Sequence, residues 1–255
     1  MTIYEYDGSF EGLLCCVFEG YRTKVWPEEI RLNTQRQVDF ISKIITIHTR
    51  VEEAERVWKG IQKQTSSEVA SNILKAFLSE IKNIEIFIFN YIRVVFDLRT
   101  EIDKNYANPY ILKIKQVVRQ VNQEVHRMHA FVRFQKTTDN IFYASIFPDF
   151  NVIPLIGDFF KKRFADQRWL IYDTKRGVGI YYDLDNIQQI QFENGKVNLK
   201  TGDVNKESRD AKEDMYQILW TNYFKAVNIV ERKNLKLQAR SMPRKYWRYL
   251  TELKK

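Results

Sequence analysis

Cysteine is nearly absent from this sequence of 255 residues, and the only two, Cys15 and Cys16, are adjacent. Adjacent cysteines cannot build the disulfide framework of a small secreted protein, and they lack the CxxC spacing of a metal or redox pair. With five prolines and nine glycines, the chain also has no linker stretch rich in these residues. We therefore expect a folded protein of a reducing compartment, and we assign it to the cytoplasm.

Long hydrophobic runs are missing as well. The longest apolar stretch, Ile84 to Phe96, is interrupted by Glu85, Asn90 and Arg93. It is shorter than the roughly 20 residues that a membrane-spanning helix requires. The first residues do not form the basic and apolar regions of a signal peptide. The sequence therefore predicts no association with a membrane.

Catalytic motifs are a third absence. The sequence contains no Walker loop, dinucleotide-binding glycine fingerprint, HExxH motif or nucleophile elbow. The histidines are His48, His126 and His129, and a metal site would have to draw further ligands from scattered acids, so we expect neither metal nor cofactor. A predicted change from helix to strand separates His126 from His129. The sequence identifies no catalytic residue, and the candidates that we name are these two histidines and Asp166.

Positive charge is what the sequence has in excess. It contains 41 Lys and Arg against 32 Asp and Glu, a formal charge of +9 with a pI near 9.3. This balance favours a polyanionic partner through long-range electrostatics.

The first half is predicted to be mainly helical. A strand at 3–6 leads through Asp7-Gly8-Ser9 into a helix, and another strand is expected at 38–47. Capping residues and apolar spacing predict four further helices. They cover 49–62, a segment opening at Thr65, 83–99, and a segment that begins with Asn108 and Pro109 and runs to about 125.

The second half is predicted to consist of hairpins and helices. The hairpin strands are 128–135 with 141–147, 169–173 with 178–183, and 187–192 with 196–200, the last turned by Asn194-Gly195. A helix is expected at 152–164, and another follows the loop 201–212. The fold class is therefore α+β, with a helical N-terminal half, an antiparallel sheet of hairpins in the middle and C-terminal helices. We treat 1–255 as one unit, with a sub-division into 1–126 and 127–255 as the alternative.

Two segments combine basic and aromatic side chains: the tail after Glu231 and the stretch from Lys161 to Trp169. Cations neutralise phosphates and aromatic rings stack on unpaired bases, so both segments suit a nucleic-acid surface. The alternative is a solvated face whose rings are anchored in the core. The candidate nucleic-acid-binding residues are Arg133, Lys161, Lys162, Arg163, Arg168, Trp169, Arg244, Lys245, Trp247 and Arg248.

Arg133 is a candidate because His129, Phe131, Arg133 and Gln135 share one side of a predicted strand. A sheet face with basic and aromatic residues can be a platform for stacking bases. Alternatively, helices cover this face and pair Arg133 with a carboxylate, which we favour.

Four motifs in order, YDGSFEGLLCCVFEGY, HRMHAFVRF, FFKKRFADQRWLIYD and MPRKYWRYL, span nearly the whole chain. They resemble the bacterial family known as "probable DNA metabolism protein". Members of that family are encoded beside a predicted DNA-modification or DNA-repair radical SAM protein, and some are fused to a uracil-DNA-glycosylase-like domain. The chain lacks the CxxxCxxC motif of a radical SAM enzyme and the loops of a typical uracil-DNA glycosylase. The resemblance therefore implies the partner of such enzymes.

The residues that match the family's motifs include many of the basic and aromatic candidates. They are Asp7, Gly8, Phe10, His126, Phe131, Arg133, Phe134, Arg163, Phe164, Arg168, Trp169, Pro243, Tyr246 and Trp247.

Three functions follow as hypotheses. The first is an accessory protein in DNA repair or DNA modification that binds DNA, a radical SAM partner, or both. The second is an enzyme acting on a damaged or modified nucleotide, with His126 or His129 and an acid such as Asp166 as acid and base. The third is a protein-interaction module without DNA contact, which would expose an apolar patch.

Overall fold

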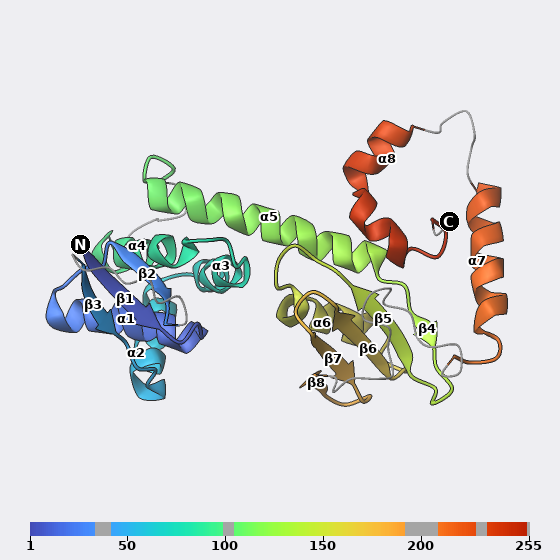
Figure 1. The fold of residues 1–255 in the computed structure, drawn as a ribbon, viewed down its shortest axis with the longest axis horizontal. Helices are drawn as coiled ribbons and strands as arrows, with labels where there is room; N and C mark the ends of the chain where they lie inside the picture. Colours follow the sequence, from blue (N-terminus) through green and yellow to red (C-terminus); the bar gives the residue numbers. More distant parts are fainter. Residues whose placement is uncertain (34–41, 99–104, 192–208, 228–233, 254–255) are drawn as a thin grey trace. The chain divides into compact units, whose positions relative to one another are not determined.

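The computed structural model describes residues 1–33, 42–98, 105–191, 209–227 and 234–253. The chain forms two compact units, Met1–Asn122 (unit 1) and Gln123–Lys255 (unit 2). Both units contain helices and strands, which confirms the α+β class (Figure 1). Helix α5 (Pro109–Phe131) begins in unit 1 and ends in unit 2. Among the described helices, none is both long enough and apolar enough to cross a membrane.

Unit 1 contains a three-stranded parallel sheet of β1 (Thr2–Tyr6), β2 (Glu29–Leu32) and β3 (Lys43–Thr46), in the order β2-β1-β3. Strand β2 was not predicted from the sequence; it has only four residues, although its polar and apolar residues do alternate. Arg31 of β2 is buried and pairs with Glu5 of β1 at 2.8 Å. A charged residue thus takes an inward position that would ordinarily be apolar.

The helices of unit 1 agree with the predicted ones within a few residues. They are α1 (Phe10–Thr23), α2 (Val51–Gln64), α3 (Ser67–Leu78) and α4 (Ile84–Leu98). The predicted capping boxes are wrong in detail: Ser66, not Thr65, caps α3, and Thr49 donates its hydroxyl to Asp7 at 2.7 Å instead of capping α2. The Asn108 cap of α5 is confirmed, because its side-chain oxygen accepts the Tyr110 N–H at 2.9 Å.

Unit 2 contains a five-stranded sheet in the order β4-β5-β6-β7-β8. Its strands are β4 (Gln135–Lys136), β5 (Phe142–Ile146), β6 (Trp169–Asp173), β7 (Val178–Tyr182) and β8 (Ile187–Ile190). The β6-β7 hairpin is confirmed. Strand β4 pairs with β5 as a hairpin, but β4 contains only Gln135 of the predicted strand 128–135. Strands β5 and β6 are parallel, so the sheet is mixed. A crossover through α6 (Ile153–Arg163) permits this parallel pairing. Strand β8 pairs with β7; the predicted strand 196–200 and its Asn194-Gly195 turn lie outside the described residues.

The predicted strand at 128–135 is wrong over most of its length, because α5 continues to Phe131. Met128 is buried and Val125, Phe131 and Val132 pack against the same cluster. Their spacing of three and four residues is helical, and this packing outweighs the local alternation that suggested a strand.

The core of unit 2 lies on one face of its sheet. Side chains of α5, α6 and the C-terminal 3-10 helix η4 (Arg244–Tyr249) pack there against β6 and β7. Trp169 and Ile171 point into this core, whereas Leu170 and Tyr172 belong to a cluster on the opposite face. Helices α7 (Glu213–Val227) and α8 (Leu235–Ser241) precede η4 in the chain.

Candidate functional site

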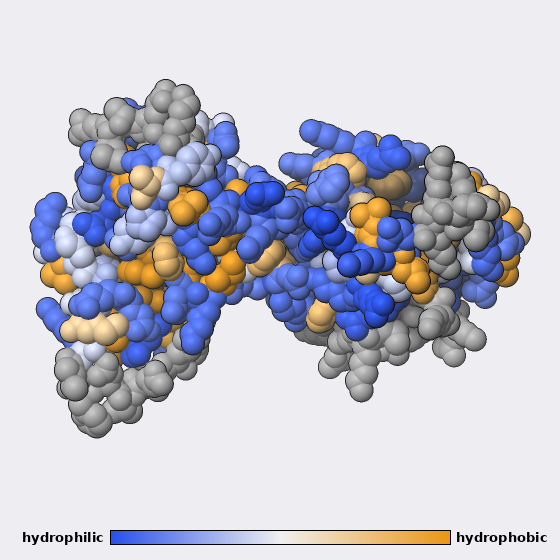
Figure 2. Space-filling view, turned by 90° about the horizontal axis from the view of Figure 1, so that it is seen from above, coloured by the Kyte–Doolittle hydropathy of each residue, from blue (hydrophilic) through white to orange (hydrophobic). Residues whose placement is uncertain are grey.

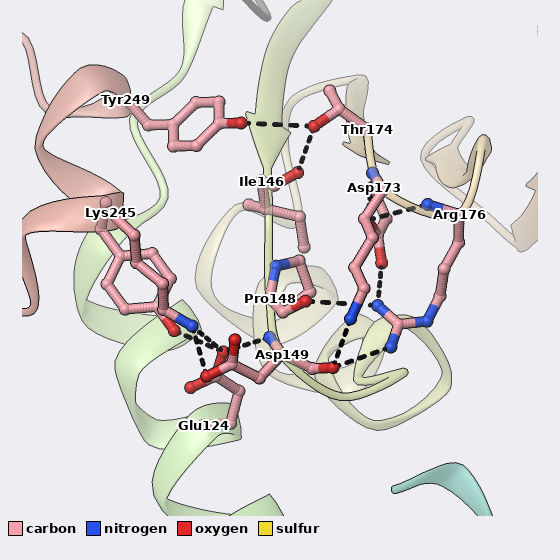
Figure 3. Close-up of polar contacts among 11 residues, drawn as sticks. Glu124, Ile146, Pro148, Asp149, Asp173, Thr174, Arg176, Lys245 and Tyr249 are labelled. Atoms are coloured by element: carbon pink, nitrogen blue, oxygen red, sulfur yellow. Dashed lines mark hydrogen bonds and ion pairs between the residues drawn. The ribbon is translucent and has the colours of Figure 1, made fainter. Parts of the chain in front are cut away.

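A buried carboxylate on α5 holds the C-terminal helix η4 in place within unit 2. Glu124 of α5 accepts the N–H of Asp149 at 2.7 Å and the hydroxyl of Tyr246 (Figure 3). Lys245 lies 3.5 Å from Glu124 and 2.5 Å from the Asp149 carboxylate. Burial, followed by the hydrogen bond to Glu124, raises the pKa of Tyr246, so this phenol stays protonated and donates. Lys245, a predicted phosphate contact, is therefore held in internal ion pairs.

A second set of contacts holds the loop before α6 (Figure 3). Arg176 donates to the carbonyls of Pro148 at 3.3 Å and Asp149 at 3.1 Å, and it pairs with buried Asp173 at 2.8 Å. Lys175 donates to the same Asp149 carbonyl at 2.9 Å. Lys175 and Arg176 therefore stabilise this loop, and we do not assign them to ligand binding.

The anchored 3-10 helix presents two exposed arginines. Arg244 lies over the Trp247 ring at 5.8 Å, and Arg248 lies over both Phe147 and Tyr249 at 4.7 Å. Neither forms an ion pair with any residue that the structure describes. Trp247 is partly buried, and its indole N–H donates to the Met242 carbonyl at 2.9 Å. The part of the tail in η4 is thus a folded basic surface in which aromatic rings contact both arginines.

The end of α6 forms a second group of exposed cations. Lys162, Arg163 and Arg168 are exposed, and no ion pair joins them to the described part of the chain. Lys161 differs, because its amine donates to the Asp185 carbonyl at 2.5 Å and lies over the Tyr182 ring. Of the predicted cluster, three cations therefore remain available for an anion.

Two other predicted contacts are engaged inside the protein. The Trp169 ring has 0% of its surface exposed and packs against Phe160 and Tyr182, so we do not retain it as a stacking residue. Arg133 pairs with the Glu252 carboxylate at 2.7 Å, as in the alternative that we favoured, but it follows α5 and does not lie on a strand.

Glu252 also joins α7 to this part of the unit, since it accepts the Trp220 indole N–H at 2.9 Å. The Arg133 guanidinium lies over the Trp220 ring at 5.6 Å. Burial by itself would raise the pKa of Glu252, but hydrogen bonds, led by the one from Arg133, outweigh it and lower that pKa.

A pocket of about 1160 Å³ lies between the end of α5, α6 and the start of α7, and we call it the ring pocket. All of its lining residues belong to unit 2. Aromatic rings and cations dominate the lining, which includes His129, Arg133, Phe134, Lys136, Phe159, Phe160, Arg163, Phe164, Lys212, Tyr216 and Trp220. This volume is slightly above the usual range of small-molecule sites, roughly 300–1,000 Å³.

Of the two histidines predicted as acid–base candidates, His129 lines the ring pocket and His126 does not. Both lie on α5, so the expected helix-to-strand break between them is wrong. His129 lines the ring pocket and stacks on Phe159 with centroids 3.9 Å apart, whereas His126 is exposed and outside the lining. Burial, then the neighbouring His126, lowers the pKa of His129, which favours a neutral ring.

The predicted acid, Asp166, does not join His129. It is exposed and does not line the ring pocket. Across the described ranges, no three His, Cys, Asp or Glu side chains come together as a metal site. The lining of the pocket offers aromatic rings for stacking and cations for an anion.

Several residues of these sites were not predicted. Glu124, Glu252, Phe159, Lys212, Tyr216 and Trp220 were not candidates. One signal was present: Glu124 lies on the apolar face of α5, beside Val121 and Met128, where a charged residue needs a buried partner. Phe159 and Tyr216 carried no such signal, because their exposure depends on elements far apart in the chain.

The excess positive charge is concentrated in unit 2. Residues 123–255 contain 24 Lys and Arg against 16 Asp and Glu, a formal charge of +8, whereas residues 1–122 contain 17 against 16, a charge of +1. The unit that holds the ring pocket and the exposed cations therefore carries nearly all of the total of +9.

Comparison with known proteins identifies a family for this chain. A family model matches residues 82–252, which include α4, α5 and almost all of unit 2, and it describes a conserved domain of unknown function. That family is DUF4130, and the chain belongs to it. No curated protein and no solved structure matches the chain.

Proposed function

We propose that the protein is an accessory protein of DNA repair or DNA modification, and that unit 2 binds DNA. The observation that carries this proposal is the charge of +8 in unit 2 against +1 in unit 1. An asymmetry of this kind between the halves of a chain is a mark of nucleic-acid binding. The family resemblance to DNA-metabolism proteins supports DNA as the polyanion.

The contacts with phosphate are assigned to cations that the fold leaves exposed. They are Lys162, Arg163 and Arg168 at the end of α6, and Arg244 and Arg248 on η4. Lys245, Arg133 and Lys161 are occupied by carboxylates or a carbonyl within the protein, so their contribution is to hold the surface together. Phosphate contacts of this kind position a protein on DNA without reading its sequence.

A matched pair of triple variants tests the proposal. Replacing Lys162, Arg163 and Arg168 with Ala should weaken binding to a duplex and reduce the slope of log K against log[salt] by up to about 3, since each phosphate contact contributes about 0.9. The control replaces three exposed cations of unit 1, Lys63, Lys82 and Arg119, and changes the net charge equally. Equal losses in both variants, or no binding by the unmodified protein, would contradict the assignment.

A protein partner is the second candidate, and the surface of α7 favours it. Met215, Ile218 and Leu219 are 49%, 61% and 56% exposed, and they do not line the ring pocket. In Figure 2, hydrophobic residues reach the surface at the right-hand end, where Figure 1 draws α7. We propose the radical SAM protein of the family resemblance as this partner.

Co-purification tests the second candidate. The radical SAM protein should be retained by the unmodified chain and lost from a variant with Met215→Gln and Leu219→Gln. The K162A/R163A/R168A variant is the control and should retain it. Retention by both variants would argue against α7 as the contact.

A further inference from the structure

The ring pocket combines exposed aromatic rings from two different helices. Phe159 of α6 is 37% exposed, and Tyr216 and Trp220 of α7 are 51% and 41% exposed. Exposed apolar surface that is gathered in one pocket is typical of a ligand-binding groove. Their flat faces suit a planar ligand, because stacking on an aromatic ring depends on surface and little on the pattern of hydrogen bonds.

Two of these rings are held in place by neighbours. Phe159 stacks on His129, with an interplanar angle of 15°. Trp220 is fixed by its hydrogen bond to Glu252. These two rings are therefore in place before a ligand binds, which reduces the entropy lost on binding.

Two exposed cations line the same pocket as the aromatic rings. Arg163 at the end of α6 and Lys212 just before α7 both line the pocket, and both side chains are exposed. The acids of the lining are already engaged: Asp210 lies 3.3 Å from the Lys136 amine, and Glu213 accepts the Lys136 N–H at 2.9 Å. The pocket therefore presents positive charge next to an aromatic surface.

We infer that the ring pocket binds one unpaired nucleotide, with its base against Phe159 and Tyr216 and its phosphate on Arg163 and Lys212. This inference rests on the proposed function and extends it from phosphate contacts to a single base. The nucleotide has two conceivable sources, a DNA strand with an unpaired base or a free mononucleotide. Both have the same planar base and phosphate.

A fluorescent base distinguishes these sources. 2-Aminopurine loses fluorescence when it stacks, so it is placed in a single strand, in a duplex opposite an abasic site, in a fully paired duplex, and in a free deoxynucleoside monophosphate. The full chain should change its fluorescence in the single strand and opposite the abasic site, and have little effect in the paired duplex. Anisotropy of an end-labelled strand measures total binding in parallel.

The variant F159L/Y216L removes both rings and keeps the apolar volume, with Tyr223→Leu as the matched control because Tyr223 is exposed on α7 outside the pocket lining. We expect F159L/Y216L to lose the fluorescence change and bind the unpaired base at least about tenfold more weakly, while its salt slope on paired duplex stays unchanged. An unchanged fluorescence response in this variant overturns the inference.

The inference and the proposed function fail in different ways. Salt-dependent binding to every DNA without a fluorescence change leaves the proposed function standing and overturns the ring pocket as a base site. Absence of binding to all strands overturns the proposed function. In that case, the free monophosphate decides the inference. If the unmodified chain binds it and F159L/Y216L does not, a nucleotide site in the ring pocket is supported. If the unmodified chain does not bind the monophosphate, the inference is overturned as well.

Discussion

At the scale of single residues, Glu124 has the most demanding position in unit 2. Its carboxylate is buried and yet is contacted by a phenol, a backbone N–H and two cations, Lys245 and Arg127. A buried charge is tolerated only when it is paired and hydrogen-bonded in this way. The same carboxylate therefore determines where η4, with Arg244 and Arg248, lies on the unit.

Replacing Glu124 with Gln should lower the free energy of unfolding by about 2 kcal/mol or more, because it leaves Lys245 and Arg127 without their shared partner and weakens the bond from Tyr246. Urea denaturation followed by circular dichroism measures the loss. Asp166→Asn is the control, since Asp166 is exposed and should change stability by less than about 0.5 kcal/mol. Similar stability of the two variants would show that the Glu124 contacts contribute little.

Glu252 gives stability a dependence on pH. Its folded pKa is lowered, the hydrogen bonds led by Arg133 outweighing the effect of burial. A carboxylate of this kind stabilises the fold above the unfolded pKa of about 4.3, and the contribution is lost as the pH falls through the folded pKa. We therefore expect E252Q to be about 1–2 kcal/mol less stable than the unmodified protein at pH 7.

The difference between the two proteins should shrink as the pH is lowered below 4, because protonated Glu252 resembles Gln. Urea denaturation at pH 7 and at successive acidic values measures it. A difference that stays constant down to pH 3 would contradict the assigned contact with Arg133.

The residue scale is also where prediction from sequence reached its limit. Arg244 and Arg248 were predicted as surface cations, and both side chains are exposed. Charged side chains without a buried partner stay in water, so their exposure could be predicted from residue type. Trp169 stands in an equally basic context but begins a strand, and the face on which it lies depends on the packing of α5, α6 and η4. No local pattern specifies that choice.

At the scale of elements, long periodic helices and tight hairpins were predictable, and pairing across the chain was not. The turn between β6 and β7 contains Gly177, which has a φ of +70°, the left-handed conformation that glycine adopts without strain. In contrast, the parallel pairing of β5 with β6 joins strands separated by α6, and neither strand carries a signal for it. The continuation of α5 to Phe131 likewise follows from tertiary packing.

Helix α7 should be the least protected of the longer helices of unit 2 in hydrogen exchange. Its only buried residue is Glu213, whereas α6 buries Ile153, Ile156, Gly157 and Phe160. Few buried apolar contacts allow a helix to open locally at low free-energy cost. Exchange measured by mass spectrometry should therefore be at least tenfold faster in peptides from 215–227 than in those from 153–163. Equal protection would mean that contacts beyond those described hold α7.

At the scale of the whole molecule, unit 2 contains both most of the net positive charge and a hydrophobic core of its own. The main hydrophobic cluster of unit 2 draws its buried residues from Met128 to Tyr246, entirely within that unit. The sequence suggested a total charge of +9 and a polyanionic partner, but it could not assign the charge to a folded unit, because the boundary falls inside the continuous helix α5.

A fragment of residues 119–255, which starts one helical turn before unit 2, should fold and bind DNA by itself. Its core is complete, and unit 2 carries a charge of +8. We expect dispersed NMR amide signals and a salt slope equal to that of the full chain, since the same cations release the same counterions.

The fragment 1–122, with a charge of +1, is the control and should bind at least tenfold more weakly. A folded 119–255 fragment with a much smaller salt slope would place essential phosphate contacts in unit 1. An unfolded one would mean that the core of unit 2 depends on residues before Arg119, and the family match from residue 82 would then mark the shortest piece worth testing.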